Sequence, residues 1–207
     1  DYPTLIYDGP YSDHILEKTP LMTSNAPQFS QDEAMQNAIK VSKDENLRFD
    51  DMQNGKIECY RFVSDNTSVS VSKNGGYTVF MRKNRTVGEG RFSYDQALSR
   101  ARKFLEENDF LNMIDTYYYT DNGVCVINFA YLDGKTICYT DLIKVGVAMD
   151  NGEIMFFESS GYLTNHTDRA FAAPTHTEEE AAQIVSSDLE IEKSSIALIP
   201  TDAGGEV

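Results

Sequence analysis

Side chains that could carry out chemistry are few in this sequence, and their spacing does not favour a reactive site. The three histidines are His14, His166 and His176, and none lies three to five residues from another His or from a Cys. Zinc sites are usually built from residues at such spacings, so we expect surface or loop histidines. The sequence therefore predicts no metal site and no cofactor.

Motifs for nucleophilic, nucleotide or sugar chemistry are also missing. Ser159-Ser160-Gly161 lacks the flanking glycine pattern of a nucleophile elbow. Gly88-Glu89-Gly90 is interpreted as a linker, because no phosphate-binding or dinucleotide-binding loop can be recognised around it. A glycosidase needs two facing carboxylates, but 33 acidic residues always offer some suggestive pair. We therefore predict no catalytic residue and expect that the protein is not an enzyme.

Three weaker features could contact a ligand or a partner. Asp8 and Asp13 could hold calcium, although a turn is the more frequent role of such residues. The run Tyr117-Tyr118-Tyr119 should place at least one ring outside the core, because neighbouring strand residues face opposite sides. It is either an ordinary cross-strand ladder or a contact surface, since Tyr is enriched at interfaces. Glycosylation triplets, which are frequent by chance, begin at Asn66, Asn84 and Asn165.

The formal net charge of −15 at pH 7 restricts the partners that the protein can have. A field of that sign repels phosphate backbones and anionic membrane surfaces, so we expect no nucleic-acid partner. About half of the net negative charge lies in residues 175–207. That segment is interpreted as a solvated surface, with a basic partner or a loosely held calcium ion as the alternatives.

The length of 207 residues allows one or two ordinary domains, or about three very small ones. Apolar residues make up 41% and charged residues 25%, which is typical of a foldable, soluble chain. No stretch reaches the roughly 18 to 20 apolar residues that span a bilayer. The chain opens at Asp1 without Met and without a visible signal peptide, so we expect a fragment of a longer protein.

The three cysteines, Cys59, Cys125 and Cys138, are too few and too odd in number for a disulfide framework. A two-residue turn at Asp133-Gly134 would place Cys138 opposite Phe129. Cys125 then lies four residues further along the strand, about 13 Å away at the usual strand rise. A disulfide needs Cα atoms within about 7 Å, so we predict free thiols.

The elements that position these residues show an internal repeat. Three segments begin with Ser or Thr, have Glu or Gln three residues later, and open an amphipathic stretch: Ser30-Gln31-Asp32-Glu33-Ala34, Ser93-Tyr94-Asp95-Gln96-Ala97 and Thr177-Glu178-Glu179-Glu180-Ala181. This pattern is the capping box that starts a helix. Phe29 and Phe92 precede the first two boxes, where a hydrophobic staple would sit. Three boxes in one chain indicate a tandem repeat.

Strands with tight turns follow the first two helices. In the second repeat we predict strands at Thr116–Thr120, Val124–Leu132, Thr136–Met149 and Glu153–Leu163, separated by Asn122-Gly123, Asp133-Gly134 and Asn151-Gly152. In the first repeat we predict strands near 56–63, 68–73 and 77–86. The third repeat has a helix near 178–187 and one strand, Ser195–Pro200. It is either cut within the repeat, or its strand docks on a neighbour, and edge pairing could then give a homodimer.

These patterns predict an α+β fold of tandem modules, each with one helix packed on a three- to four-stranded antiparallel sheet, the third module being truncated. The predicted boundaries are an N-terminal extended segment at 1–28, a first repeat at 29–90, a second repeat at 91–166 and a partial third repeat at 175–207. The segment 1–28 either packs on the first repeat as a tail or ends an upstream domain.

A helix followed by an antiparallel meander resembles the PepSY module. The segments Tyr2–His14, Lys144–Glu153 and Gly161–His166 resemble spore-germination proteins of the YpeB type, and the likeness covers essentially the whole chain. The resemblance implies an exported protein of an endospore former, on the inner-membrane or cortex side of the spore, tethered through an anchor outside this fragment.

The resemblance also implies a role. A YpeB-type protein would accompany a spore cortex-lytic enzyme and stabilise or restrain it, without catalytic residues of its own. Direct inhibition of a protease or hydrolase is one alternative, and an enzyme acting on cortex peptidoglycan is a second, less favoured one. The incomplete third module departs from the family pattern and leaves its binding competence open.

Overall fold

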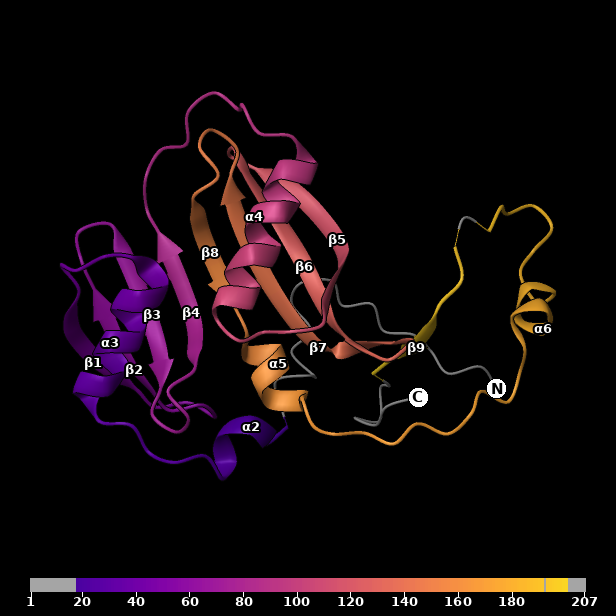
Figure 1. Cartoon of the computed structure of the whole chain (residues 1–207), viewed down its shortest axis with the longest axis horizontal. Helices are drawn as coiled ribbons and strands as arrows, with labels where there is room; N and C mark the ends of the chain where they lie inside the picture. Colours follow the sequence, from indigo (N-terminus) through magenta and orange to yellow (C-terminus); the bar gives the residue numbers. More distant parts are fainter. Residues whose placement is uncertain (1–17, 192, 201–207) are drawn as a thin grey trace.

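The computed structural model describes residues 18–191 and 193–200. In Figure 1, α3 (Gln31–Ser42) and α4 (Tyr94–Glu107) lie on the same face of a broad antiparallel sheet. The shorter helices are α2 (Leu21–Ser24), α5 (Ser160–Asn165) and α6 (Glu178–Ala182). The strands are β1 (Arg48–Gln53), β2 (Cys59–Val63), β3 (Thr67–Ser72), β4 (Thr78–Lys83), β5 (Met113–Asp121), β6 (Val124–Asp133), β7 (Thr136–Ala148), β8 (Ile154–Glu158) and β9 (Ile196–Leu198).

The sheet runs without a break from the first half of the chain into the second. In the described residues its strand order is β1-β2-β3-β4-β8-β7-β6-β5, and the two halves of this order mirror each other. The central pair, β4 and β8, is antiparallel and places Met81 opposite Phe157. In the next pairs outward, Val69 lies opposite Met81 and Val145 lies opposite Phe157. An approximate twofold axis through the Met81–Phe157 pair therefore relates the two halves.

The predicted α+β class, with a helix on an antiparallel sheet in each half, is confirmed. The sequence does not predict that the two sheets merge edge to edge, nor does it predict β1. The pairing of β4 with β8 satisfies the backbone groups of two strands that would otherwise be sheet edges. The halves therefore form one platform and do not hang on a loose linker.

The three predicted capping boxes are confirmed. The hydroxyl groups of Ser30, Ser93 and Thr177 each accept a hydrogen bond from the backbone N–H three residues later, and Glu33, Gln96 and Glu180 close the boxes. These bonds satisfy N–H groups that a helix start leaves free. The third box opens only a five-residue helix, and none of its residues is buried. This helix ends at Ala182 and is therefore shorter than the helix predicted near 178–187.

The residues before the first two boxes, Phe29 and Phe92, fasten each helix to its sheet. The N–H of Phe29 donates to the carbonyl of Lys73 at 2.8 Å, and the N–H of Phe92 donates to that of Met149 at 2.9 Å. Each ring covers a turn glycine of positive φ, and a Cβ on Gly76 or Gly152 would lie 2.5 or 2.6 Å from the ring. Only glycine fits these two turns, because both the φ angle and the ring exclude a side chain.

Small residues let both helices approach the sheet closely. Ala34 and Ala38 of α3, and Ala97 and Ala101 of α4, are fully buried against it. Larger side chains fill the remaining space in one hydrophobic core that extends under both helices, and Phe62, Phe129 and Phe157 are its largest fully buried members. A common core and a common sheet predict that the two halves unfold together.

The predicted fourth strand of the second repeat is wrong beyond Glu158. β8 ends there, and α5 begins at Ser160, where the sequence predicts a strand that continues to Leu163. The backbone N–H of Ser160 donates to the Glu158 carboxylate at 2.8 Å, which turns the chain. α5 then packs on the sheet and buries Tyr162 and Leu163. The apolar character of these buried residues is the reason why the sequence predicts a longer strand.

The hairpin register around Cys138 also differs from the prediction. Asp133 pairs with Thr136, so the turn is one residue later than predicted, and a bulge between Ala130 and Tyr131 shifts the register again. The shifted turn alone places Cys138 opposite Tyr131 and not opposite Phe129, because the bulge lies beyond this pair. The strand predicted at Ser195–Pro200 is present as β9, which pairs in parallel with β7 of the same chain.

One arginine, Arg85, holds the linker that joins the two halves between β4 and α4. Both terminal nitrogens of Arg85 donate to the Asp150 carboxylate, at 2.8 and 2.9 Å, and its Nε donates to Glu153 at 2.7 Å. The backbone N–H of Gly88 donates to the same Asp150 carboxylate. The hydrogen bonds from Arg85 and Gly88 hold the pKa of Asp150 well below its usual range. The connecting segment is thus fixed on the β7–β8 turn.

Candidate functional site

The outer edge of β5 is the longest open strand edge of the platform. β5 is the last strand of the sheet order, and no described strand pairs with its outer side. Asn122 and Gly123, with φ of 46° and 77°, form the tight turn that joins it to β6, as the sequence predicts. β6 takes the backbone N–H and C=O groups of about every second residue of this nine-residue strand, and those of the residues between point outward as a template for pairing with another strand.

The tyrosine run lies on this edge strand. Tyr117 and Tyr118 are 49% and 47% exposed, which confirms the prediction that at least one ring lies outside the core. Tyr118 stacks on Tyr94 of α4 at a centroid distance of 4.0 Å, so it faces the helix side. Tyr117 and Tyr119 lie 6.3 Å apart on the opposite side, as strand alternation requires. An incoming strand would meet aromatic rings on both faces of β5.

Polar groups fix the tyrosines on the helix side without adding net charge. The Tyr94 hydroxyl donates to Asp115 at 3.1 Å, and Arg102 pairs with the same carboxylate at 2.6 Å. Burial, together with the negative charge of Asp115, raises the pKa of Tyr94 to about 12. The phenol therefore stays protonated at neutral pH. The edge offers main-chain hydrogen bonds and neutral aromatic contact area, which suits protein recognition and not bond cleavage.

A buried ion cluster, which the sequence does not predict, anchors the chain beyond α5. Asp141 of β7 is fully buried, and Arg169 donates to both of its oxygens at 2.8 Å. Thr140 also donates to this carboxylate at 2.9 Å. Nδ1 of His166 lies 2.8 Å from Asp141 Oδ2. Burial alone would raise the pKa of Asp141, but the hydrogen bonds from His166 and Arg169 and the Arg169 charge lower it below its usual value.

His166 lies in the loop directly after α5, as the sequence predicts, but it is packed and paired and is not a surface histidine. Its side chain is 20% exposed, and its ring stacks on Tyr162 at 4.2 Å and meets Tyr131 edge-on at 4.5 Å. Sequence spacing could not find this partner, because 25 residues separate it from Asp141. Although the Asp141–His166 pair resembles the base of a catalytic triad, Arg169 already neutralises the carboxylate, so the cluster is suited to anchoring.

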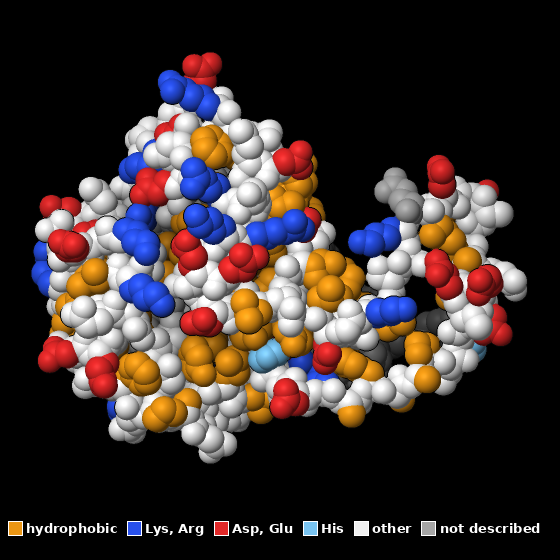
Figure 2. Space-filling view, viewed as in Figure 1, with side chains coloured by type: hydrophobic (Ala, Val, Ile, Leu, Met, Phe, Trp, Pro, Cys, Tyr) orange, Lys and Arg blue, Asp and Glu red, His pale blue; other side chains and the backbone are white. Residues whose placement is uncertain are grey.

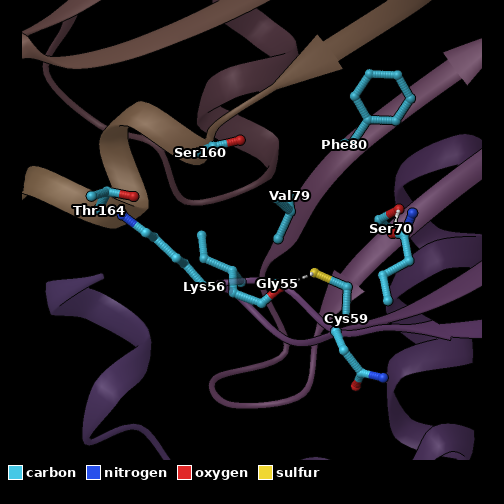
Figure 3. Close-up of a pocket in the computed structure, with 11 residues that line it drawn as sticks. Gly55, Lys56, Cys59, Ser70, Val79, Phe80, Ser160 and Thr164 are labelled. Atoms are coloured by element: carbon cyan, nitrogen blue, oxygen red, sulfur yellow. Dashed lines mark hydrogen bonds between the residues drawn. The ribbon is translucent and has the colours of Figure 1, made fainter. Parts of the chain in front are cut away.

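A cavity lies between the loop after β1, β4 and α5 (Figure 3). Its volume is about 610 Å³, and its lining contains no Asp, Glu or His that could serve Ser160 or Cys59 as a general base. Figure 3 shows the Lys56 side chain extending toward α5. Burial raises the pKa of the Cys59 thiol to about 12, so it is not a nucleophile at neutral pH. The cavity can hold a molecule but offers no reactive pair.

The remaining predicted residues are readily placed. Cys59, Cys125 and Cys138 are all free and buried, which confirms the prediction from spacing. His176 is exposed and pairs with Glu180 at 3.6 Å. His14, Asp8, Asp13 and the tail before residue 18 lie outside the described residues. Among the residues that the structure describes, no group of three His, Cys, Asp or Glu side chains could hold a metal ion.

No helix in the described ranges is long and apolar enough to cross a bilayer.

Comparison with known proteins shows which family this chain resembles. A family model described as "YpeB sporulation, PepSY1 and PepSY2 domains" matches residues 1–172. A Sporulation protein YpeB from Halalkalibacterium halodurans is 37% identical over 141 residues, which are 67% of this chain and 31% of that protein. The protein of the same name from Bacillus subtilis is 28% identical over 193 residues, 87% of this chain and 42% of that protein.

The chain thus spans about a third to two fifths of the length of these curated relatives. Among solved structures, the Bacillus megaterium YpeB C-terminal domain matches with a TM-score of 0.79 at 21% identity, covering 88% of this chain and 85% of that chain. At this identity the likeness establishes the fold. The family model and the curated relatives confirm the resemblance inferred from the sequence.

Proposed function

This chain belongs to the YpeB family of sporulation proteins, and from that premise we propose that it binds a spore cortex-lytic enzyme and stabilises or restrains it without catalysing a reaction. The observation that carries the proposal is the open β5 edge with its exposed tyrosines. A protein that holds an enzyme needs a rigid contact surface, and main-chain pairing along a fixed edge provides one.

The proposal treats residues 29–90 and 91–166 as two modules of one platform, with residues 175–207 as a partial third. It also places the protein outside the cell membrane, on the inner-membrane or cortex side of the spore, as the resemblance implies. No nucleic-acid partner is expected for a chain of net charge −15.

The equivalent edge of the first module provides an internal control. Tyr118 lies opposite Ile127, and Phe49 of β1 lies opposite Phe62, the residue that corresponds to Ile127. In the same register, Arg48 of β1 occupies the position of Tyr117. Tyr117→Arg therefore introduces a side chain that the matching position of the other module already carries.

The test is retention of a purified cortex-lytic hydrolase of the same organism on the immobilised chain at micromolar concentration. We expect the wild-type chain to retain the hydrolase, the double variant Tyr117→Arg, Tyr118→Asp to bind at least tenfold more weakly, and Arg48→Ala to bind normally. A tenfold loss corresponds to about 1.4 kcal/mol, a modest share of one interface hot spot. Failure of the folded wild-type chain to retain the hydrolase would count against the proposal.

Two further measurements separate the modes of action. Turnover of the bound hydrolase distinguishes a stabilised active enzyme from one that is inhibited directly. Sedimentation of the chain alone shows whether two copies pair through β5 instead, in which case dimer formation and hydrolase binding would compete and share their sensitivity to Tyr117→Arg.

A further inference from the structure

Two small cavities flank the approximate twofold axis in the groove between α3 and α4. The Asn37 pocket, of about 240 Å³, is lined by Asn37, Lys40, Gly76, Tyr77 and Thr78, among others. The Arg100 pocket, of about 230 Å³, is lined by Arg100, Lys103, Gly152, Glu153 and Ile154, among others. Each pocket also receives the C-terminal end of the opposite helix: Asn108 in the first and Lys43 in the second.

These pockets occupy equivalent places in the two modules. Asn37 and Arg100 each lie seven residues after the cap serine of their helix, and Lys40 and Lys103 each lie ten residues after it. Gly76 and Gly152 are the turn glycines that Phe29 and Phe92 cover. The two pockets therefore share a helix face and a strand turn, although Met22 of α2 and Tyr162 of α5 line the Asn37 pocket only.

Charge is what distinguishes the Arg100 pocket. Four cationic side chains line it, from Lys43, Lys83, Arg100 and Lys103, against the two carboxylates of Glu107 and Glu153. Its counterpart has one lysine, Lys40, and one carboxylate, Asp109. Figure 2 shows Lys and Arg side chains gathered over this groove on the helix-bearing face. In a chain of net charge −15, such a cluster is a local reversal of sign.

Two of the four cations pair with no carboxylate among the residues that the structure describes. Lys83 pairs with Glu153 at 2.8 Å, a carboxylate that Arg85 also contacts, and Lys103 reaches Glu107 at 3.8 Å. Arg100 and Lys43 form no ion pair within the described part of the chain. The Arg100 Nε lies 3.3 Å from the place where a Cβ of Gly152 would be, so the side chain rests across this turn. The pocket thus presents an unsatisfied positive charge at a defined place.

The end of α3 determines where the Lys43 side chain lies. Lys43 ends α3 in the left-handed region, with φ 59° and ψ 31°, where helices usually carry glycine. A lysine pays a steric penalty there that glycine avoids. This backbone conformation fixes the point at which the Lys43 side chain leaves α3 in the wall of the pocket.

From these observations we propose that the Arg100 pocket binds a carboxylate group carried on a small apolar body, with Arg100 and Lys43 as its charged contacts. The fork of the Arg100 guanidinium matches the two oxygens of a carboxylate. Val41, Phe104 and Ile154 supply apolar wall beside the cations. The carboxylate can belong to a free organic acid or to the C-terminus of a peptide with an apolar last residue. This inference goes beyond the proposed function and does not depend on it.

The test is calorimetric titration of the intact chain at low ionic strength with benzoate, with N-acetyl-leucine as a peptide C-terminus, with the neutral isostere benzamide, and with inorganic phosphate. We expect benzoate or N-acetyl-leucine to bind, and the tighter of the two identifies the source of the carboxylate. Benzamide should not bind, and phosphate, which lacks the apolar body, should bind at least tenfold more weakly.

The variants use the second pocket as their control. Arg100→Asn gives the Arg100 pocket the residue of its counterpart and should weaken carboxylate binding at least tenfold, whereas Lys40→Ala in the Asn37 pocket should leave it unchanged. Lys43→Gly should also weaken binding while raising the thermal midpoint, because glycine relieves the left-handed cap. Unchanged affinity in folded Arg100→Asn, equal binding of benzamide, or no binding of either acid would overturn the proposal.

Discussion

The two outer strands of the sheet, β1 and β5, occupy equivalent places but differ in length and in the side chains that they carry. β1 is a six-residue strand with Arg48, Asp50 and Asp51 along it, and charged residues of this kind discourage pairing with another strand. β5 has nine residues and places three tyrosines at its centre. The same module therefore blocks its edge in one copy and leaves it open in the other.

The interior of the two modules carries buried apolar side chains at equivalent positions. Val69 and Val145 are equivalent and fully buried, and Met81 and Phe157 meet on the twofold axis. Burial restricts these positions to apolar side chains that fill the same space. Edge residues bear no such restriction, so a duplicated module can acquire a separate role at its edge and in its groove.

The largest effect should come from breaking the junction itself. Phe157 packs against Phe104 at 5.3 Å and Phe110 at 5.5 Å, and Phe157→Ala should lower the free energy of unfolding by about 3–5 kcal/mol. Met81→Ala, on the other side of the axis, should cost a similar amount. Urea denaturation followed by far-UV circular dichroism should show one transition in both variants. Two separate transitions would mean that the modules are independent.

A slightly smaller loss should distinguish the ion cluster of the second module from the exposed pairs of the first. Arg169→Ala leaves the Asp141 carboxylate buried without its main partner, which costs roughly 3 kcal/mol. The matched control is Arg61→Ala, whose partner Asp50 is 42% exposed, and it should cost less than about 1 kcal/mol. Equal losses in the two variants would contradict a special role for the buried cluster.

The same cluster should make stability depend on acid. Because the folded state lowers the pKa of Asp141, its contribution is fully present above the unfolded pKa of about 3.9 and declines as pH falls through the lower folded value. Arg169→Ala removes two of the contributions that lower this pKa, so the pKa should lie above its wild-type value and the loss should begin at higher pH. Chemical denaturation at a series of pH values between about 2 and 7 measures both curves, and coincident curves would exclude Asp141 as their source.

Helix caps should have a smaller and equal effect in the two modules. Ser30→Ala and Ser93→Ala each remove one side of a capping box and should destabilise the protein by about 1 kcal/mol. Replacement by Thr, which keeps the hydroxyl, should largely restore stability. A marked difference between the two serines in urea denaturation would show that the modules use their helices unequally.

The smallest effect is expected in the third capping box. α6 has five residues and buries none of them, so Thr177→Ala should leave the global unfolding free energy unchanged within about 0.3 kcal/mol. A loss of unfolding free energy close to that of Ser30→Ala would show that residues 175–200 unfold together with the core.

Local chemistry made part of this structure predictable from the sequence. A capping box needs a hydroxyl and an acid or amide three residues apart, and the Asn122-Gly123 turn needs two residues that accept positive φ. The exposure of the tyrosines follows from strand alternation, and the free thiols from strand spacing. All of these signals act over a few neighbouring residues, so a single sequence is enough to interpret them.

Tertiary structure alone decided how these pieces meet. The β4–β8 junction joins Met81 to Phe157, the ion cluster joins Asp141 to Arg169, and the Arg100 pocket takes Lys43 from the opposite module. Each of these three contacts joins segments that lie far apart in the chain. Such segments meet only when the shared core forms and excludes water. Propensity and spacing act locally, whereas the choice of partner across the sheet is made by the packing of the whole molecule.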